Sequence, residues 1–173
     1  MFSEDYSIMT ALQNLKEDDL RRLIRAFLAK RVSEYNVQPL HGTGEHGKDT
    51  IATVDKTNDP LGRTQILLIQ VKTGDISLGN WVDKISGQML AAFCTVEKDF
   101  PRETSRDNLR RLVLFTNGEL KPEAFKSVQE WNRTMPIPVE VFDIWGLLSL
   151  FKKYGVRPND FQELLSWAQK LAL

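Results

Sequence analysis

Three residues in two short segments of the sequence combine the side-chain types that hydrolyse a phosphodiester bond with the help of a metal ion. Asp49 follows Gly47-Lys48, and Gln70 and Lys72 stand two residues apart at the end of an apolar run. Because side chains alternate along a strand, Gln70 and Lys72 project from one face, and Asp49 reaches them if its strand is the neighbour. This spacing predicts one site built from a carboxylate, an amide and an amine.

The chemistry of these groups suits a divalent cation held by oxygen atoms. Mg2+ prefers oxygen ligands and keeps several waters, so one or two protein oxygens can suffice. We expect the carboxylate of Asp49, the amide oxygen of Gln70 and the backbone carbonyl of Val71 to bind Mg2+ or Mn2+, and Lys72 to orient or activate the attacking water. Since Gln70 is neutral, the site has one negative charge fewer than a pair of acids and should hold the metal more loosely.

Three further polar residues are candidates for accessory roles. Glu45 and His46 belong to a glycine-rich turn that could bring them to the metal and the scissile phosphate, although an exposed polar loop is the commoner explanation. Gln88 is spaced to lie on the sheet-facing side of its helix, where it could touch the site or the substrate. A helix-surface glutamine is the commoner explanation there.

Length and composition are those of one ordinary globular domain. The chain has 173 residues, of which 42% are hydrophobic and 27% charged, and its net charge is zero. A neutral chain is not expected to bind nucleic acid indiscriminately through its whole surface. Local basic clusters remain, although such clusters are more often solvated faces than DNA contacts. They are Arg21, Arg22, Arg25, Lys30 and Arg31 in one segment, and Arg106, Arg110 and Arg111 in another.

Cys94 is the one cysteine of the sequence, which excludes an intramolecular disulfide and fits a reducing compartment. Its apolar neighbours, among them Phe93 and Val96, predict a small core residue rather than a nucleophile. The first residues contain no basic stretch leading into an apolar one, and the apolar runs are much shorter than a membrane span. We therefore expect a cytoplasmic location.

Hydrophobic periodicity and turn signals predict helices and strands in the order αβββαβαβαα. Thr50 to Lys72 has the pattern of a hairpin around the turn at Asn58 to Gly62. The order predicts a mixed sheet flanked by helices within a single domain, 1–173. The predicted helices are Glu17 to Ser33, a helix capped by Asn80 and Asp83, Pro122 to about Arg133, Asp143 to Tyr154, and one opened by Asn159 and Gln162; the predicted strands are Val37 to Leu40, Thr50 to Val54, Ile66 to Val71, Arg111 to Phe115 and Pro138 to Phe142.

Several segments share the pattern of one nuclease superfamily. His41 to Ala52 holds a Gly-x-Asp strand start, Ile69 to Lys72 has glutamine in place of a second acid, and the likeness continues through Ile85 to Gln88, Phe115 to Gly118 and Val141 to Asp143. The sequence resembles the Mrr-type branch of the PD-(D/E)xK restriction-endonuclease-like superfamily over most of the chain. The resemblance implies a three-layer α/β/α fold with a central mixed β-sheet, a core at about 15–154 and a C-terminal helix at about 159–172. It also implies that Asp49, Gln70 and Lys72 occupy the catalytic positions.

The first predicted helix departs from that family's pattern. The family often has a glutamate there that points at the metal, where this chain has Arg21. Asp18 or Asp19 could substitute after a small shift of register. The departure leaves Asp49 as the one firmly placed carboxylate.

The resemblance implies a Mg2+-dependent endonuclease that hydrolyses DNA, in restriction or anti-phage defence and often as the nuclease module of a larger system. Lys48, Arg21 and Arg25 are then candidates for contact with the DNA backbone. We expect a homodimer or higher oligomer, or a fused or partner sensor or NTPase module, and the sequence does not separate DNA from RNA. The alternative is a catalytically inactive nuclease-like domain that binds nucleic acid or protein as an assembly module, which Gln70, Arg21 and the neutral charge favour.

Overall fold

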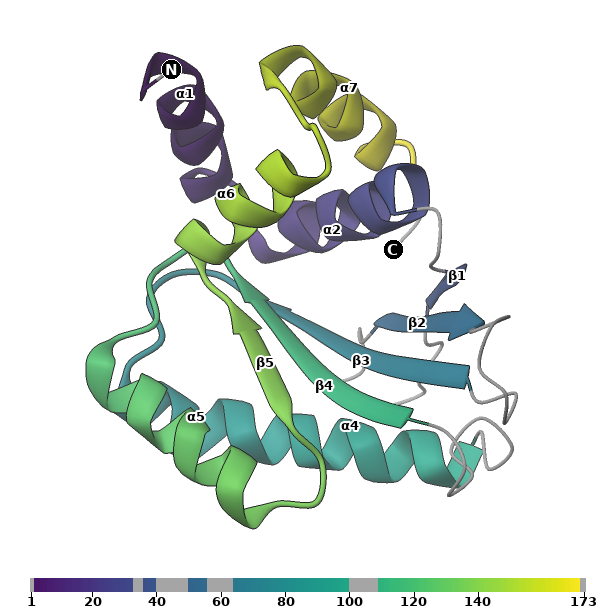
Figure 1. Ribbon diagram of the computed structural model, residues 1–173, viewed down its shortest axis with the longest axis vertical. Helices are drawn as coiled ribbons and strands as arrows, with labels where there is room; N and C mark the ends of the chain where they lie inside the picture. Colours follow the sequence, from purple (N-terminus) through teal and green to yellow (C-terminus); the bar gives the residue numbers. More distant parts are fainter. Residues whose placement is uncertain (1, 33–35, 40–49, 56–63, 100–108, 172–173) are drawn as a thin grey trace.

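The computed structural model describes residues 2–32, 36–39, 50–55, 64–99 and 109–171. Within these ranges, helices surround a sheet whose strands come from the middle of the chain (Figure 1). The elements are α1 (Phe2–Gln13), α2 (Glu17–Arg31), β1 (Asn36–Pro39), β2 (Thr50–Asp55), β3 (Thr64–Lys72), α3 (Leu78–Asn80), the π-helical turn η1 (Trp81–Ile85), α4 (Ser86–Asp99), β4 (Leu109–Thr116), α5 (Pro122–Thr134), β5 (Val139–Phe142), α6 (Ile144–Lys153) and α7 (Pro158–Ala168).

The five strands lie in the order in which they occur in the chain, β1-β2-β3-β4-β5. The first three are antiparallel neighbours, whereas β3 and β4, and β4 and β5, are parallel. The helices that connect the parallel strands let the carboxyl ends of β3, β4 and β5 gather at one edge of the sheet (Figure 1). The predicted hairpin and the predicted mixed sheet are both confirmed.

Each face of the sheet packs against its own layer of helices. Leu67, Ile69 and Val71 of β3 contact the cluster that includes buried residues of α1, α2, α6 and α7. Leu68 points the other way, into a cluster with residues of η1, α4 and α5. Since β3 is covered on both faces, its apolar run is continuous rather than alternating. The three-layer α/β/α architecture with a central mixed sheet is confirmed.

Most helix boundaries agree with the sequence, and two differ from it. Asp143 caps α6 as predicted, accepting hydrogen bonds from the backbone N–H groups of Trp145 and Gly146 at 3.1 and 3.0 Å. Helix α1, which packs on α6 and α7, was not predicted. The helix expected to begin at Asn80 begins earlier, because the hydroxyl of Ser77 caps α3 by accepting from the Asn80 N–H.

Cys94 lies on the solvent-facing side of α4 and is exposed, so its prediction as a core residue is wrong. The buried side of the helix is marked by Met89, which is fully buried. Cys94 follows Met89 by five residues, which is about 140° further around an α-helix. The spacing to Met89, rather than the apolar character of its neighbours, determines its exposure.

The carboxyl ends of β3 and β4 are joined by a network of hydrogen bonds around Asn117. Its Nδ2 donates to the carbonyls of Leu12 and Leu15, at 2.8 and 3.0 Å, and its Oδ1 accepts from the N–H of Gly74 at 2.9 Å. The hydroxyl of Thr116 donates to the carbonyl of Gly74 at 2.7 Å. These contacts fix the loop after β3 and attach it to the α1–α2 connection; we call them the Asn117 junction.

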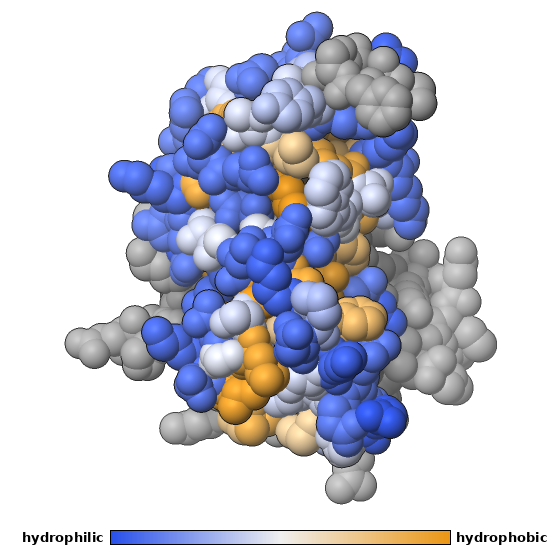
Figure 2. Space-filling model, turned by 90° about the vertical axis from the view of Figure 1, so that its left-hand side faces the viewer, coloured by the Kyte–Doolittle hydropathy of each residue, from blue (hydrophilic) through white to orange (hydrophobic). Residues whose placement is uncertain are grey.

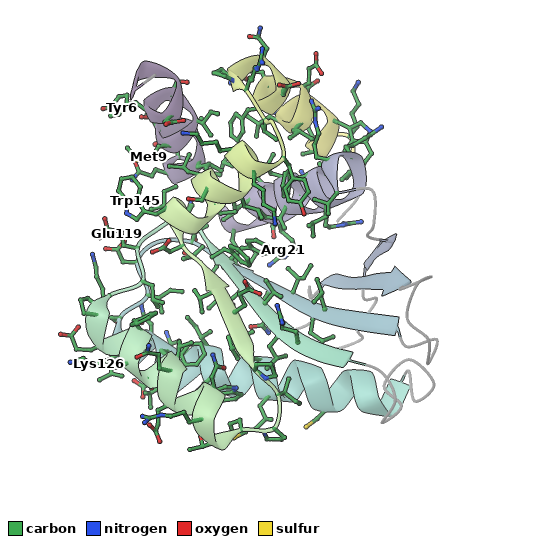
Figure 3. The ribbon with its side chains drawn as sticks, viewed as in Figure 1. Tyr6, Met9, Arg21, Glu119, Lys126 and Trp145 are labelled. Carbon is green, nitrogen blue, oxygen red and sulfur yellow. The ribbon has the colours of Figure 1, made fainter. Side chains whose placement is uncertain are left out.

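Some large apolar side chains remain on the surface. Tyr6, Met9 and Trp145 lie along the edge of the molecule that carries α1 and the start of α6 (Figure 3), and Tyr6 and Trp145 are exposed. The space-filling view of this side shows apolar atoms running between hydrophilic ones (Figure 2). Among the described residues, no helix has both the length and the apolar character needed to cross a membrane.

Candidate active site

Gln70 and Lys72 lie near the carboxyl end of β3 and share the face of Leu68, toward the α4 layer. Gln70 is buried and lies opposite Leu114 of β4, and Lys72 is half-buried and lies opposite Thr116. Val71 points its side chain into the opposite layer. The strand therefore brings the predicted amide and amine to one face, as the spacing indicated.

The other predicted members of the site fall outside the described residues. They are Asp49, Glu45, His46 and Lys48. Strand β2 begins at Thr50, the residue after Asp49, and Thr50 lies opposite Ile69. The antiparallel register therefore brings the start of β2 next to Gln70. The role of Asp49 as a ligand stays a prediction.

The amide oxygen of Gln70 is a buried acceptor without a donor. Its residue is 6% exposed, and Oε1 accepts no hydrogen bond from the part of the chain that the structure describes. A buried polar atom in this state costs about 1–3 kcal/mol, so it is favourable to supply it with a donor or a cation. An unpartnered amide oxygen fits one ligand position of a divalent cation. The described ranges contain no group of three or more His, Cys, Asp or Glu that could hold a metal by itself.

Lys72 is a half-buried cation at the same strand end. Within the described ranges it forms no ion pair. A lysine that only protects an exposed edge strand would lie at the rim of the sheet, whereas β3 is the central strand. The position of Lys72 in the central strand therefore does not fit the role of an edge-protecting lysine.

Arg21, where the resembling family often has an acid, is a buried residue of α2. It lies on the side of the helix that faces the sheet (Figure 3) and is 9% exposed. Its guanidinium binds Asp18 at 2.6 Å and Glu17 at 2.9 Å. Asp19 lies 3.8 Å from Arg22 in a more exposed pair. These contacts give Arg21 a role within α2, and two of the three acids at the start of that helix are its partners.

The remaining basic residues of α2 differ in their surroundings. Burial, together with the nearby charges of Arg21 and Arg22, lowers the pKa of half-buried Arg25. At the end of the helix, Arg31 pairs with Asp160 of α7, and the ammonium of Lys30 lies 4.6 Å from the ring centre of Trp167. This end of α2 is used to hold α7 in place.

Two residues near the site were undervalued from the sequence. Asn117 was given no role, and a surface position was favoured for Gln88. Asn117 forms the junction described above. The sequence showed only that Asn117 belongs to a Thr-Asn-Gly turn at the end of a strand. Gln88 lies in α4 and is half-buried, with its Oε1 buried and lacking a donor among the described residues. Its position three residues after Ile85 was the available signal, because Ile85 is buried against the sheet.

No protein-family model matches this sequence, and no curated protein matches it. Solved structures do. The DNA modification-dependent restriction endonuclease AspBHI superimposes with a TM-score of 0.64 at 12% identity, over 96% of this chain and 40% of that one. The chain has a restriction-endonuclease-like fold. The structure of MspJI restriction endonuclease in complex with a 27-mer oligonucleotide is similar at a TM-score of 0.51 and 13% identity, over 95% of this chain and 34% of that one. The structure of restriction endonuclease FokI bound to DNA is similar at a TM-score of 0.54 and 13% identity, over 94% of this chain and 29% of that one.

These comparisons set the scale of the likeness. At 12–13% identity they show a shared fold. This chain spans between 29% and 40% of the length of the three endonucleases. The likeness therefore applies to one part of each of those larger proteins.

Proposed function

We propose that this chain is a Mg2+-dependent endonuclease that hydrolyses DNA. The observation that carries the proposal is the pair of Gln70 and Lys72 on one face of the central strand, beside the start of β2. Among the described residues, the amide oxygen of Gln70 has no donor and the amine of Lys72 has no ion pair. The same fold occurs in AspBHI, MspJI and FokI, which are restriction endonucleases, and MspJI and FokI were solved with an oligonucleotide or DNA.

Each residue of the proposed site has a distinct role. The carboxylate of Asp49, the amide oxygen of Gln70 and the carbonyl of Val71 would hold Mg2+ or Mn2+. The bound cation supplies positive charge to the scissile phosphate and increases the acidity of water. Lys72 orients the attacking water by donating a hydrogen bond to it, and its charge stabilises the anion that develops on the phosphate.

The proposal includes a place in a larger system. AspBHI is described as modification-dependent, and this chain corresponds to 40% of it. We infer a nuclease module of the Mrr type in restriction or anti-phage defence, whose target is chosen by a fused region, a partner chain or a second copy. Lys48 and Arg25 are the proposed contacts with the DNA backbone. Arg21 is left out of this set because its guanidinium is held by Asp18 and Glu17.

The test is cleavage of plasmid DNA, single-stranded DNA and RNA with Mg2+ or Mn2+ by the native chain and by Asp49→Ala and Lys72→Ala. We expect metal-dependent cutting of DNA that falls at least about a hundredfold in each variant. Lys126→Ala is the matched control, because Lys126 is an exposed lysine of α5. Activity that survives Lys72→Ala overturns the role of Lys72. Cutting of RNA alone overturns the substrate, and native protein that binds DNA without cutting it supports an assembly module instead.

A further inference from the structure

A second amide on the helix that covers the proposed site has the same unusual state as Gln70, and the inference drawn from it rests on the proposed function. Gln88 belongs to α4, which packs on β3. Its Oε1 and that of Gln70 are both buried, and no described residue donates a hydrogen bond to either. Across the ranges that the structure describes, these two are the buried side-chain acceptors in this state.

The two amides belong to the same layer of the molecule. Gln70 follows Leu68 by two residues and shares its face of β3, and Leu68 packs in one cluster with Ile85 and Met89. Gln88 follows Ile85 by three residues, about 60° around the helix from it, so it lies at the edge of the buried side that Ile85 and Met89 mark and is half-buried. The two buried acceptors thus belong to the layer in which α4 packs on β3.

The backbone before Gln88 adds an independent observation. In η1 the N–H of Ser86 donates to the carbonyl of Trp81, five residues earlier, which is the bond of a π-helical turn. The additional residue of such a turn rotates the following helix by about 100° relative to a regular α-helix. This rotation sets which side chains of α4 meet the sheet. Wide turns of this kind are rare and occur often at functional sites.

Neutral amides suit a buried site that binds a cation reversibly and is empty for part of the time. A second carboxylate in this layer would leave an uncompensated buried charge whenever no cation is bound, whereas an amide leaves only an unmet hydrogen bond. A neutral amide lowers the affinity for the metal, because Gln70 carries no negative charge. An additional acceptor for the waters that a divalent cation keeps around it offsets part of that loss.

We propose that Gln88 is a cation-positioning residue: its Oε1 accepts a hydrogen bond from the hydration shell of the divalent cation that Gln70 binds. Gln88 acts through that water and is not a direct ligand. Binding of the hydrated cation supplies donors or positive charge to both amide oxygens. The two glutamines then act together, one from the strand and one from the helix above it.

The experiment measures binding of Mn2+ to the full chain by the electron paramagnetic resonance signal of the free ion, together with the melting temperature in chelator. We expect Gln88→Leu to weaken Mn2+ binding about tenfold or more while the melting temperature without metal stays the same or rises. Gln88→Glu keeps an acceptor and adds charge, so it is expected to bind Mn2+ at least as tightly as the native chain. Gln129→Leu on the exposed side of α5 is the control and leaves binding unchanged.

The outcomes separate this inference from the proposed function. If the native chain binds Mn2+ and Gln70→Leu does not, but Gln88→Leu binds as the native chain does, the role of Gln88 is overturned and the metal site stands. If the native chain binds no Mn2+, the proposed metal site fails and the role of Gln88 with it. Should Gln88→Leu not fold, Gln88→Glu decides, since weaker binding by that variant contradicts the inference.

Discussion

Asn117 and Gln70 are two buried amides at the same edge of the sheet, in opposite states. Asn117 is 4% exposed and Gln70 is 6% exposed. Gln70 belongs to β3, and Asn117 directly follows β4, the parallel neighbour of β3. Asn117 donates twice and accepts once, to and from backbone groups of two loops. Gln70 has an acceptor that no described residue supplies with a proton.

The difference separates a structural amide from one that is available to a ligand. A structural amide is buried because its partners are backbone groups that would otherwise lack hydrogen bonds. An amide that binds a ligand is buried with one of its hydrogen-bonding atoms unpaired, which lowers the free energy of unfolding. Binding of the ligand restores that stability. Changes that damage the fold should therefore concentrate at the Asn117 junction, and changes that affect the metal at Gln70.

The largest expected effect comes from Gly118→Ala at the Asn117 junction. A Cβ at this position would lie 2.1 Å from the carbonyl carbon of Gly74 and 2.4 Å from the N of Asp75, and both neighbours are backbone atoms. We expect a loss of about 3 kcal/mol or more in the free energy of unfolding, measured by urea denaturation. Gly87→Ala is the control: its Cβ meets nothing within 4 Å, and it should gain up to about 1 kcal/mol as a helical alanine. Equal stability of the two variants would contradict the close approach at Gly118.

Asn117→Leu should cost somewhat less, about 2 kcal/mol, because it leaves the carbonyls of Leu12 and Leu15 and the N–H of Gly74 without this partner. Mg2+ should not restore this loss. The comparison is Asn132→Leu, which removes a similar pair of bonds to the backbone of Val139 from an exposed residue and should cost about 1 kcal/mol. Denaturation with and without Mg2+ measures both. A Mg2+-dependent recovery of Asn117→Leu would place the junction in the site.

Gln70→Leu is expected to change the stability of the metal-free chain little, or to raise it by about 1 kcal/mol, because an unmet buried acceptor is removed. We expect Mg2+ to raise the melting temperature of the native chain and to leave that of Gln70→Leu unchanged. Gln70→Glu should do the reverse, lowering stability in chelator and giving a larger increase with Mg2+. Thermal melts in both conditions test this. A large loss of stability in chelator for Gln70→Leu would make Gln70 a structural amide like Asn117.

The smallest effect is a pH dependence at the rim of the junction. The backbone N–H of Glu119, and then Lys121, hold the pKa of Asp75 below its ordinary value of 3.8. A carboxyl group with a lowered pKa stabilises the fold above its unfolded pKa and loses that contribution as the pH falls through the folded value. We expect Asp75→Asn to be slightly less stable than the native chain at neutral pH, with a difference that shrinks as the pH falls through the lowered pKa of Asp75. A difference that does not change with pH would assign the effect to the neutral hydrogen bond alone.

The sheet and most helices could be predicted from the sequence because their signals are local. The apolar run of β3, the turn before it and the cap at Asp143 each lie within a few residues. Helix α1 was missed because its buried residues, Ile8 and Leu12, are few and its stability comes from packing on α6 and α7. The π-helical turn was missed because the sequence does not distinguish an i+5 bond from an i+4 bond. The Ser77 cap was missed because Asn80, three residues later, was predicted to cap the helix.

The common face of Gln70 and Lys72 could be predicted, but the hydrogen-bonding state of the Gln70 amide could not. That Gln70 and Lys72 share a face follows from strand geometry alone. That the Gln70 oxygen is buried without a donor among the described residues depends on how the layers pack around β3, which strand geometry does not give. The partners of Asn117 are 105 and 102 residues earlier in the sequence, so no local pattern could have revealed them.

Those separations also concern the order in which the molecule assembles. The amide of Asn117 can meet Leu12 and Leu15 only after β4 has joined β3, since the loops to be closed span over half of the chain. We therefore expect the α1–α2 connection to dock late, after the rate-limiting step of folding. Interactions absent from that transition state govern how fast a protein comes apart. Loss of Asn117 should then increase the unfolding rate and leave the folding rate nearly unchanged. This one side chain would therefore contribute to the kinetic stability of the folded chain.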